Sequence, residues 1–78
     1  MKVFVVYPGA RSGWELLREG ERTPLHFNEK DSAIGYGRCL ADANRPSALR
    51  VETSYGTVEA AWRFEHAEAV PAAGAAGR

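Results

Sequence analysis

The stretch Gly35-Tyr36-Gly37-Arg38-Cys39-Leu40 contains the first two glycines of a G-x-G-x-x-G phosphate-binding pattern. In dinucleotide-binding proteins these glycines lie in a strand-to-helix turn, where free backbone N–H groups hold a phosphate. Here leucine occupies the third glycine position, and a capping signal at Asn28 starts a helix seven residues before Gly35. Both glycines therefore lie inside a helix, where the N–H groups are already hydrogen-bonded. We predict no cofactor site.

A nucleophilic or metal site has equally little support. Cys39, the only cysteine, falls on the polar side of that helix, and no sequence context places His26 or His66 beside its thiol. Neither histidine has a cysteine or carboxylate at a spacing that would complete a metal site. We interpret the remaining acidic candidates as surface positions: Asp31, Asp42, Glu59 and Glu65. We predict no catalytic residue and no metal, and expect that the protein is not an enzyme.

The composition is that of a soluble globular protein. The 78 residues are 45% hydrophobic and 26% charged, with ten basic side chains against ten acidic ones. This balance weighs against nucleic-acid binding, which is driven mainly by neutralising phosphates. The apolar run at residues 3–7 is too short for a signal peptide core or a membrane span. We expect a cytoplasmic protein without membrane contact.

Strand and helix signals alternate in an α+β pattern. Segments rich in β-branched and aromatic residues predict three strands before the helix, the third of them short: residues 2–7, 13–19 and 24–27. The helix runs from an N-cap at Asn28 to about Ala43, where a left-handed Asn44 and Pro46 end it. On its buried face Gly37 is central, and a glycine there lets the helix approach the sheet closely.

The sequence after the helix predicts a hairpin that turns at residues 55–56. Pairing Val51 with Ala60 and Leu49 with Trp62 keeps the apolar side chains on one face, whereas a one-residue slip would mix them with charges. The predicted fold is α+β, a small antiparallel sheet with one helix packed on one face. Its order is strand, strand, short strand, helix, strand, strand.

The chain divides into one domain and a tail. Residues 1–65 carry all the strand and helix signals, and we expect them to form a single α+β domain. Residues 66–78, HAEAVPAAGAAGR, have no apolar stripe to bury, and we expect a flexible Ala/Gly-rich tail.

The first strand is apolar on both faces, although a single helix covers only one side of a sheet. If Tyr7 faces Trp14 and Val5 faces Leu16, the helix covers these side chains. Four other apolar residues then remain together on the opposite face: Phe4, Val6, Leu17 and Ala61. A contiguous apolar cluster with a polar rim is typical of an interface, so we expect a homodimer, with edge-to-edge strand pairing as the alternative geometry.

This layout resembles a widespread family of small bacterial domains of unknown function. The helix carries the closest similarity, and further matches lie in the strands and turns: Ala33, Ile34, Tyr36, Arg38, Leu40, Ala41, Gly13, Trp14, Val51, Gly56 and Val58. The resemblance covers about residues 3–60. It implies this fold but no activity and no catalytic residue.

Two hypotheses for function remain. The first is a non-catalytic interaction domain that binds a protein partner or itself. The alternative is a nucleic-acid-binding module that uses surface arginines: Arg11, Arg18, Arg22, Arg45 and Arg50. A contiguous arginine patch would favour the alternative, and interspersed carboxylates would favour the first.

Overall fold

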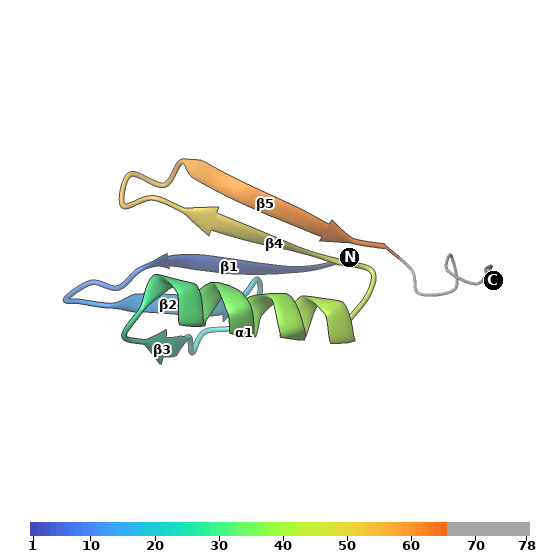
Figure 1. The fold of residues 1–78 in the computed structure, drawn as a ribbon, viewed down its shortest axis with the longest axis horizontal. Helices are drawn as coiled ribbons and strands as arrows, with labels where there is room; N and C mark the ends of the chain where they lie inside the picture. Colours follow the sequence, from blue (N-terminus) through green and yellow to red (C-terminus); the bar gives the residue numbers. More distant parts are fainter. Residues whose placement is uncertain (66–78) are drawn as a thin grey trace.

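The structure is a computed structural model that describes residues 1–65. The expected tail, 66–78, lies outside the described residues. Figure 1 shows a five-stranded sheet with one helix packed on one face. The elements follow in the order β1 (Lys2–Pro8), β2 (Trp14–Arg18), β3 (Leu25–Phe27), α1 (Lys30–Ala43), β4 (Ser47–Glu52) and β5 (Val58–Phe64). The α+β class, the position of the helix and the element order are confirmed.

The sheet is mixed rather than wholly antiparallel. Its strand order is β3-β2-β1-β4-β5, in which β1 pairs antiparallel with β2 but parallel with β4. Parallel neighbours need a long crossover connection, and the segment through β2, β3 and α1 supplies it. The sequence did not predict this central pairing, because β1 and β4 are separated by the whole of that segment.

The register of β1 and β2 differs by one residue from the prediction. Tyr7 lies opposite Glu15, and Pro8 lies opposite Trp14. Strand β1 extends through Pro8, and the N–H of Gly9 donates to the carbonyl of Gly13 at 2.9 Å, which closes a shorter loop than expected. Because side chains alternate along a strand, this one-residue difference exchanges the two faces of β1.

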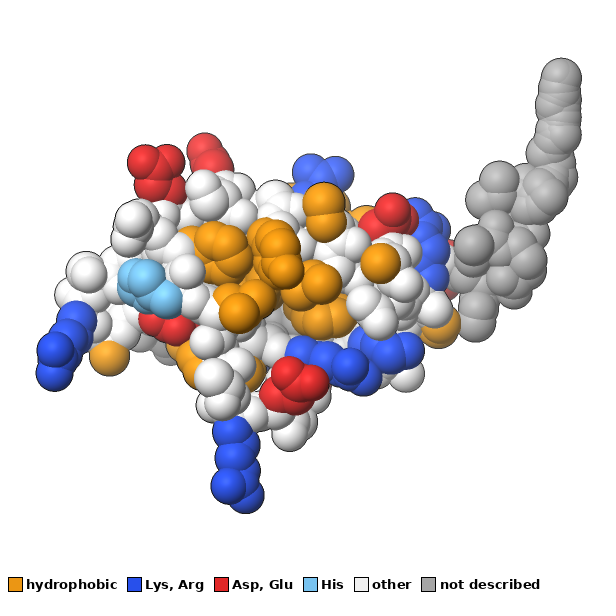
Figure 2. Space-filling view, turned by 90° about the horizontal axis from the view of Figure 1, so that it is seen from below, with side chains coloured by type: hydrophobic (Ala, Val, Ile, Leu, Met, Phe, Trp, Pro, Cys, Tyr) orange, Lys and Arg blue, Asp and Glu red, His pale blue; other side chains and the backbone are white. Residues whose placement is uncertain are grey.

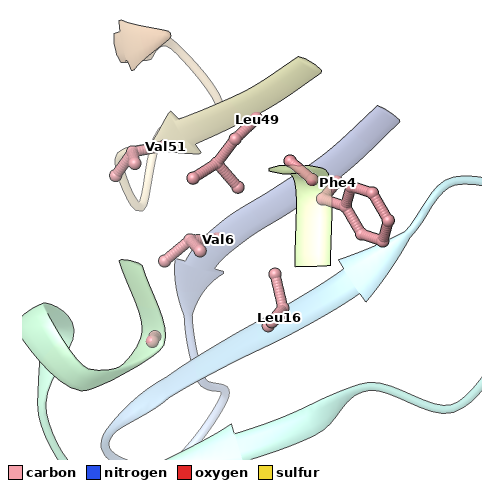
Figure 3. Packing of buried hydrophobic residues seen from close by; sticks show 7 residues of the cluster. Phe4, Val6, Leu16, Leu49 and Val51 are labelled. Carbon is pink, nitrogen blue, oxygen red and sulfur yellow. The ribbon is translucent and has the colours of Figure 1, made fainter. Parts of the chain in front are cut away.

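The core lies between the central strands and α1. Figure 3 shows five side chains from β1, β2 and β4 that point toward one another: Phe4, Val6, Leu16, Leu49 and Val51. The helix covers them with three small residues, Ala33, Gly37 and Ala41, all of which are buried. The predicted burial of Gly37 is confirmed.

The helix boundaries differ slightly from those predicted. The N-cap is Glu29 rather than Asn28, and its side chain makes no capping hydrogen bond. At the other end Asn44 has φ −120°, so it is not left-handed as predicted. Its side-chain amide instead donates to the carbonyl of Leu40 at 2.7 Å, which satisfies one of the carbonyls left free at a helix end.

The closing hairpin has the predicted register over most of its length. Val51 lies opposite Ala60, and Leu49 lies opposite Trp62. A bulge then shifts the pairing, so that Glu52 lies opposite Val58 and Glu59 is the extra residue.

Candidate functional site

A groove runs beside the C-terminal half of α1. It encloses about 210 Å³ between α1, β1, β2 and the connection to β3. Four apolar side chains from four elements line it: Phe4, Leu16, Leu25 and Leu40. Four polar residues complete the lining: Arg18, Glu21, Thr23 and Asn44. We call this feature the α1/β3 groove. An apolar lining beside polar groups of both signs suits an apolar side chain flanked by polar backbone.

The groove continues into an exposed apolar patch. Leu25 is 46% exposed and Tyr36 is 47% exposed, so two large hydrophobic side chains face solvent here. The Tyr36 ring lies 5.6 Å from the ring of Phe27, which joins α1 to β3 across the patch. Figure 2 shows hydrophobic side chains gathered on the side of the molecule where α1 and β3 lie. Grouped apolar surface of this kind marks binding sites more often than scattered residues do.

A second surface lies along β5, at the opposite edge of the sheet. The aromatic side chains of β5 point to the helix face and pack against the edge of the core, where arginines from α1 and from the connection after it lie over them. The guanidinium of Arg38 lies 5.4 Å from the centre of the Trp62 ring, and that of Arg45 lies 5.5 Å from the Phe64 ring. Both rings remain half-buried.

The predicted self-association face is divided between the two sides of the sheet. Phe4 is 4% exposed and Val6 is fully buried, both in the core beneath α1. Because of the one-residue difference in register, the prediction had placed them on the wrong face. Leu17 and Ala61 do lie, as predicted, on the face of the sheet opposite α1, which we call the uncovered face. Their neighbours Leu16 and Trp62 point toward the helix side, and side chains alternate along a strand.

Ion pairs cross the uncovered face instead. Arg50 lies opposite Val5 on the neighbouring strand, and its guanidinium bonds Glu19 at 2.8 Å and Glu52 at 3.2 Å. These hydrogen bonds, chiefly the one to Glu19, raise the pKa of Arg50. Beside them Glu15 bonds His26 at 2.7 Å. Val5 is 8% exposed even though α1, the helix within residues 1–65, lies on the other face. The uncovered face therefore carries a charge network rather than a purely apolar cluster.

The five arginines of the nucleic-acid hypothesis do not lie on one element. Arg45 pairs with Asp42 at 2.6 Å beside the C-terminus of α1, and Arg50 pairs with two glutamates on the uncovered face. Arg18 lines the α1/β3 groove. The other two, in the connections on either side of β2, are exposed: Arg11 and Arg22. Carboxylates thus alternate with arginines on two of the surfaces.

Cys39 and His26 lie on different elements, α1 and β3, and His66 is outside the described residues. Gly35 and Gly37 both lie inside α1, and Cys39 is exposed on its surface, as predicted. His26 lies on the uncovered face, with Glu15 as its partner. Across residues 1–65, no three His, Cys, Asp or Glu side chains are grouped closely enough to hold a metal ion. In the same part of the chain no helix is sufficiently long and apolar to cross a membrane.

The sequence did not reveal the α1/β3 groove. It is lined by residues from four elements, and their meeting depends on the phase of β1, that is, on which of its alternate side chains face the helix. A partial signal was present, because helical spacing placed Leu40 and Asn44 on the same arc as Gly37, and both line the groove.

The fold and these surfaces define a small single-helix α+β domain with an open apolar groove. The chain belongs to the bacterial family described as "Uncharacterized protein conserved in bacteria (DUF2188)", whose model matches residues 3–64. The resemblance stated from the sequence is confirmed. Neither the comparison with curated proteins nor that with solved structures finds a match.

Proposed function

We propose that this domain is a non-catalytic binding module that takes an apolar side chain of a protein partner into the α1/β3 groove. The observation that carries the proposal is the continuity between the groove and the exposed patch at Leu25 and Tyr36. A partner segment that inserts one anchor side chain would also cover this patch. Such central anchors in apolar pockets supply most of the affinity of protein interfaces.

The size of the groove favours an anchor side chain over a cofactor. Pockets for drug-sized ligands and cofactors enclose about 300–1,000 Å³. The α1/β3 groove encloses about 210 Å³. Its rim carries one guanidinium and one carboxylate, from Arg18 and Glu21, so it has no single charge sign that would select a phosphate.

The nucleic-acid alternative has weaker support from the electrostatics. Binding to phosphates would require Arg45 and Arg50 to give up their carboxylate partners. Three arginines remain for such a role: Arg11, Arg18 and Arg22. They are separated along the chain and flanked by Glu19 and Glu21. Interspersed carboxylates favour the protein-binding hypothesis.

A peptide-display selection on the immobilised domain tests the proposal. We expect enriched peptides that share one large apolar residue. In a titration followed by NMR, their binding should shift the backbone signals of Thr23, Leu25 and Leu40. The variant Leu25→Gln should weaken binding without unfolding the domain, since this side chain is already half-exposed. Tyr55→Gln is the matched control, because Tyr55 is 91% exposed and lies in the turn before β5.

Two outcomes would contradict the proposal. One is peptide binding that Leu25→Gln leaves unchanged. The other is salt-dependent binding of a single-stranded oligonucleotide that shifts the signals of Arg11 and Arg22 while no peptide binds, which would favour the alternative.

A further inference from the structure

The apolar and the polar residues of the α1/β3 groove lie at different ends of it. On the sheet, Leu16 in the middle of β2 lies opposite Leu25 of β3, and Arg18 follows Leu16 on the same face of its strand. On the helix, Leu40 comes about one turn before Asn44. Each wall of the groove therefore changes from a leucine to a polar residue.

The direction of α1 brings these polar residues together. The ring of Tyr36 lies 5.6 Å from that of Phe27, which pairs with the first residue of β2, so the later turns of α1 lie toward Arg18 at the other end of that strand. Glu21 lies at the same end, because its N–H donates to the carbonyl of Arg18 at 3.0 Å. We call the group of Arg18, Glu21 and Asn44 the polar end of the groove.

Both charged groups at the polar end are available to a ligand. Arg18 and Glu21 are exposed, and within residues 1–65 neither forms an ion pair with another side chain or with each other. Asn44 donates to the carbonyl of Leu40, and its side-chain oxygen can accept a further hydrogen bond. Figure 2 shows side chains of both charge signs beside the hydrophobic patch on this side of the molecule.

A ligand that satisfies this arrangement carries both charges on one head group, next to an apolar body. An α-amino acid has this form. Its carboxylate matches the two parallel donors of the Arg18 guanidinium, and its ammonium donates to the carboxylate of Glu21. The groove volume of about 210 Å³ equals that of about seven water molecules, which suits a molecule of the size of leucine.

We propose that the α1/β3 groove binds a free α-amino acid with a branched aliphatic side chain. The carboxylate pairs with Arg18, the ammonium pairs with Glu21, and the side chain lies among the three leucines that line the apolar part: Leu16, Leu25 and Leu40. This inference goes beyond the proposed function, because its ligand is a small molecule that needs no protein partner.

Ligands with a single charge fit the polar end less well. A fatty acid or a phosphate would bring its negative charge beside Glu21, and like charges in proximity repel. An aliphatic amine would leave Arg18 without a partner and place two positive charges together. Only a head group with both signs avoids these repulsions.

Titration of the full chain with L-leucine, followed by NMR, tests the proposal. We expect a Kd of about 1 mM, since so small a ligand makes few contacts, with shifts of the backbone signals of Arg18, Leu25 and Leu40. Two analogues with the same side chain are the matched controls: isocaproate lacks the ammonium, and isopentylamine lacks the carboxylate. Each should bind about fivefold more weakly, because each loses one exposed ion pair.

Two variants assign the charges to their partners. In Glu21→Gln, the advantage of leucine over isocaproate should disappear. In Arg18→Gln, the advantage of leucine over isopentylamine should disappear. Arg22→Gln is the control and should retain both preferences, because Arg22 lies next to Glu21 in the sequence but does not line the groove. All three side chains are exposed, so we expect the variants to fold as the wild type does.

The absence of leucine-dependent shifts at about 50 mM, far above the expected Kd, would overturn the proposal. So would equal binding of leucine and its two analogues, or preferences for leucine that Arg18→Gln and Glu21→Gln both retain. Peptide binding at the groove without leucine binding would overturn this inference and leave the proposed function intact. Leucine binding without peptide binding would do the reverse.

Discussion

Gly37 of α1 lies directly over Leu49 of β4. A Cβ atom at position 37 would stand 3.0 Å from Cδ1 of Leu49 and 3.2 Å from Cδ1 of Leu16. Contacts this short require the neighbouring side chains to move, and both leucines are buried, at 0% and 2% exposure. The glycine that looked like part of a phosphate-binding loop therefore sets the distance between the helix and the sheet.

The two glycines of α1 should respond oppositely to alanine. Gly35→Ala should raise the free energy of unfolding by about 1 kcal/mol, because alanine favours the helix and nothing lies within 4 Å of the new methyl group. Gly37→Ala gains the same propensity but overpacks the core, which costs about 1–3 kcal/mol, so we expect a net loss. Urea denaturation of both variants checks the signs. A stabilised Gly37→Ala would show that the core yields to the added carbon.

Ser47 links the start of β4 to the end of α1. Ser47 is 1% exposed, and its hydroxyl donates to the carbonyl of Ala41. Ser47→Ala should lower the free energy of unfolding by about 1 kcal/mol, the net value of a buried hydrogen bond. The loss should be no larger, because the N–H of Asn44 also donates to that carbonyl, at 3.1 Å. Thermal or urea denaturation measures the change, and an unchanged stability would contradict the assignment.

Arg38 should protect the Trp62 ring from solvent. In Arg38→Ala, we expect the free energy of unfolding to fall by about 0.5–1 kcal/mol, the value of an exposed cation–π contact. With Trp14→Phe as background, Trp62 fluorescence should shift to longer wavelength. Arg11→Ala is the control, because Arg11 is exposed in the loop before β2. An equal effect of both arginine variants would exclude a specific contact.

Tyr7 should make the fold sensitive to alkaline pH. Burial raises the pKa of the Tyr7 phenol above 10.0, and the carboxylate of Glu15 adds to the shift. The unfolded chain then loses this proton first, so stability should fall as the pH rises past about 10. Below that pH the contribution is fully present. Tyr7→Phe should lack this part of the alkaline loss in unfolding measurements across that range. Parallel pH profiles for the two proteins would contradict the assignment.

In the second half of the chain, the local spacing of apolar residues was sufficient to predict the helix and most of the hairpin register. In the closing hairpin, apolar residues alternate on both strands. Pairing Leu49 with Trp62 keeps these residues on one face, whereas a one-residue shift in register would mix them with charges. The helix was similarly constrained, since its small residues define one face. In β1 the same reasoning failed. Val3, Phe4, Val5 and Val6 are all apolar, so alternation carries no information about which of them the helix covers.

By itself, the sequence determined the α+β class, the element order, the burial of Gly37 and the exposure of Cys39, because each follows from residues close together in the chain. The tertiary structure alone decided three features: the phase of β1, its parallel pairing with β4, and the α1/β3 groove. The loop closed between Gly9 and Gly13 fixes the first, and the crossover through α1 allows the second. The groove follows from both, since Phe4 and Leu40 meet there only after distant elements have packed together.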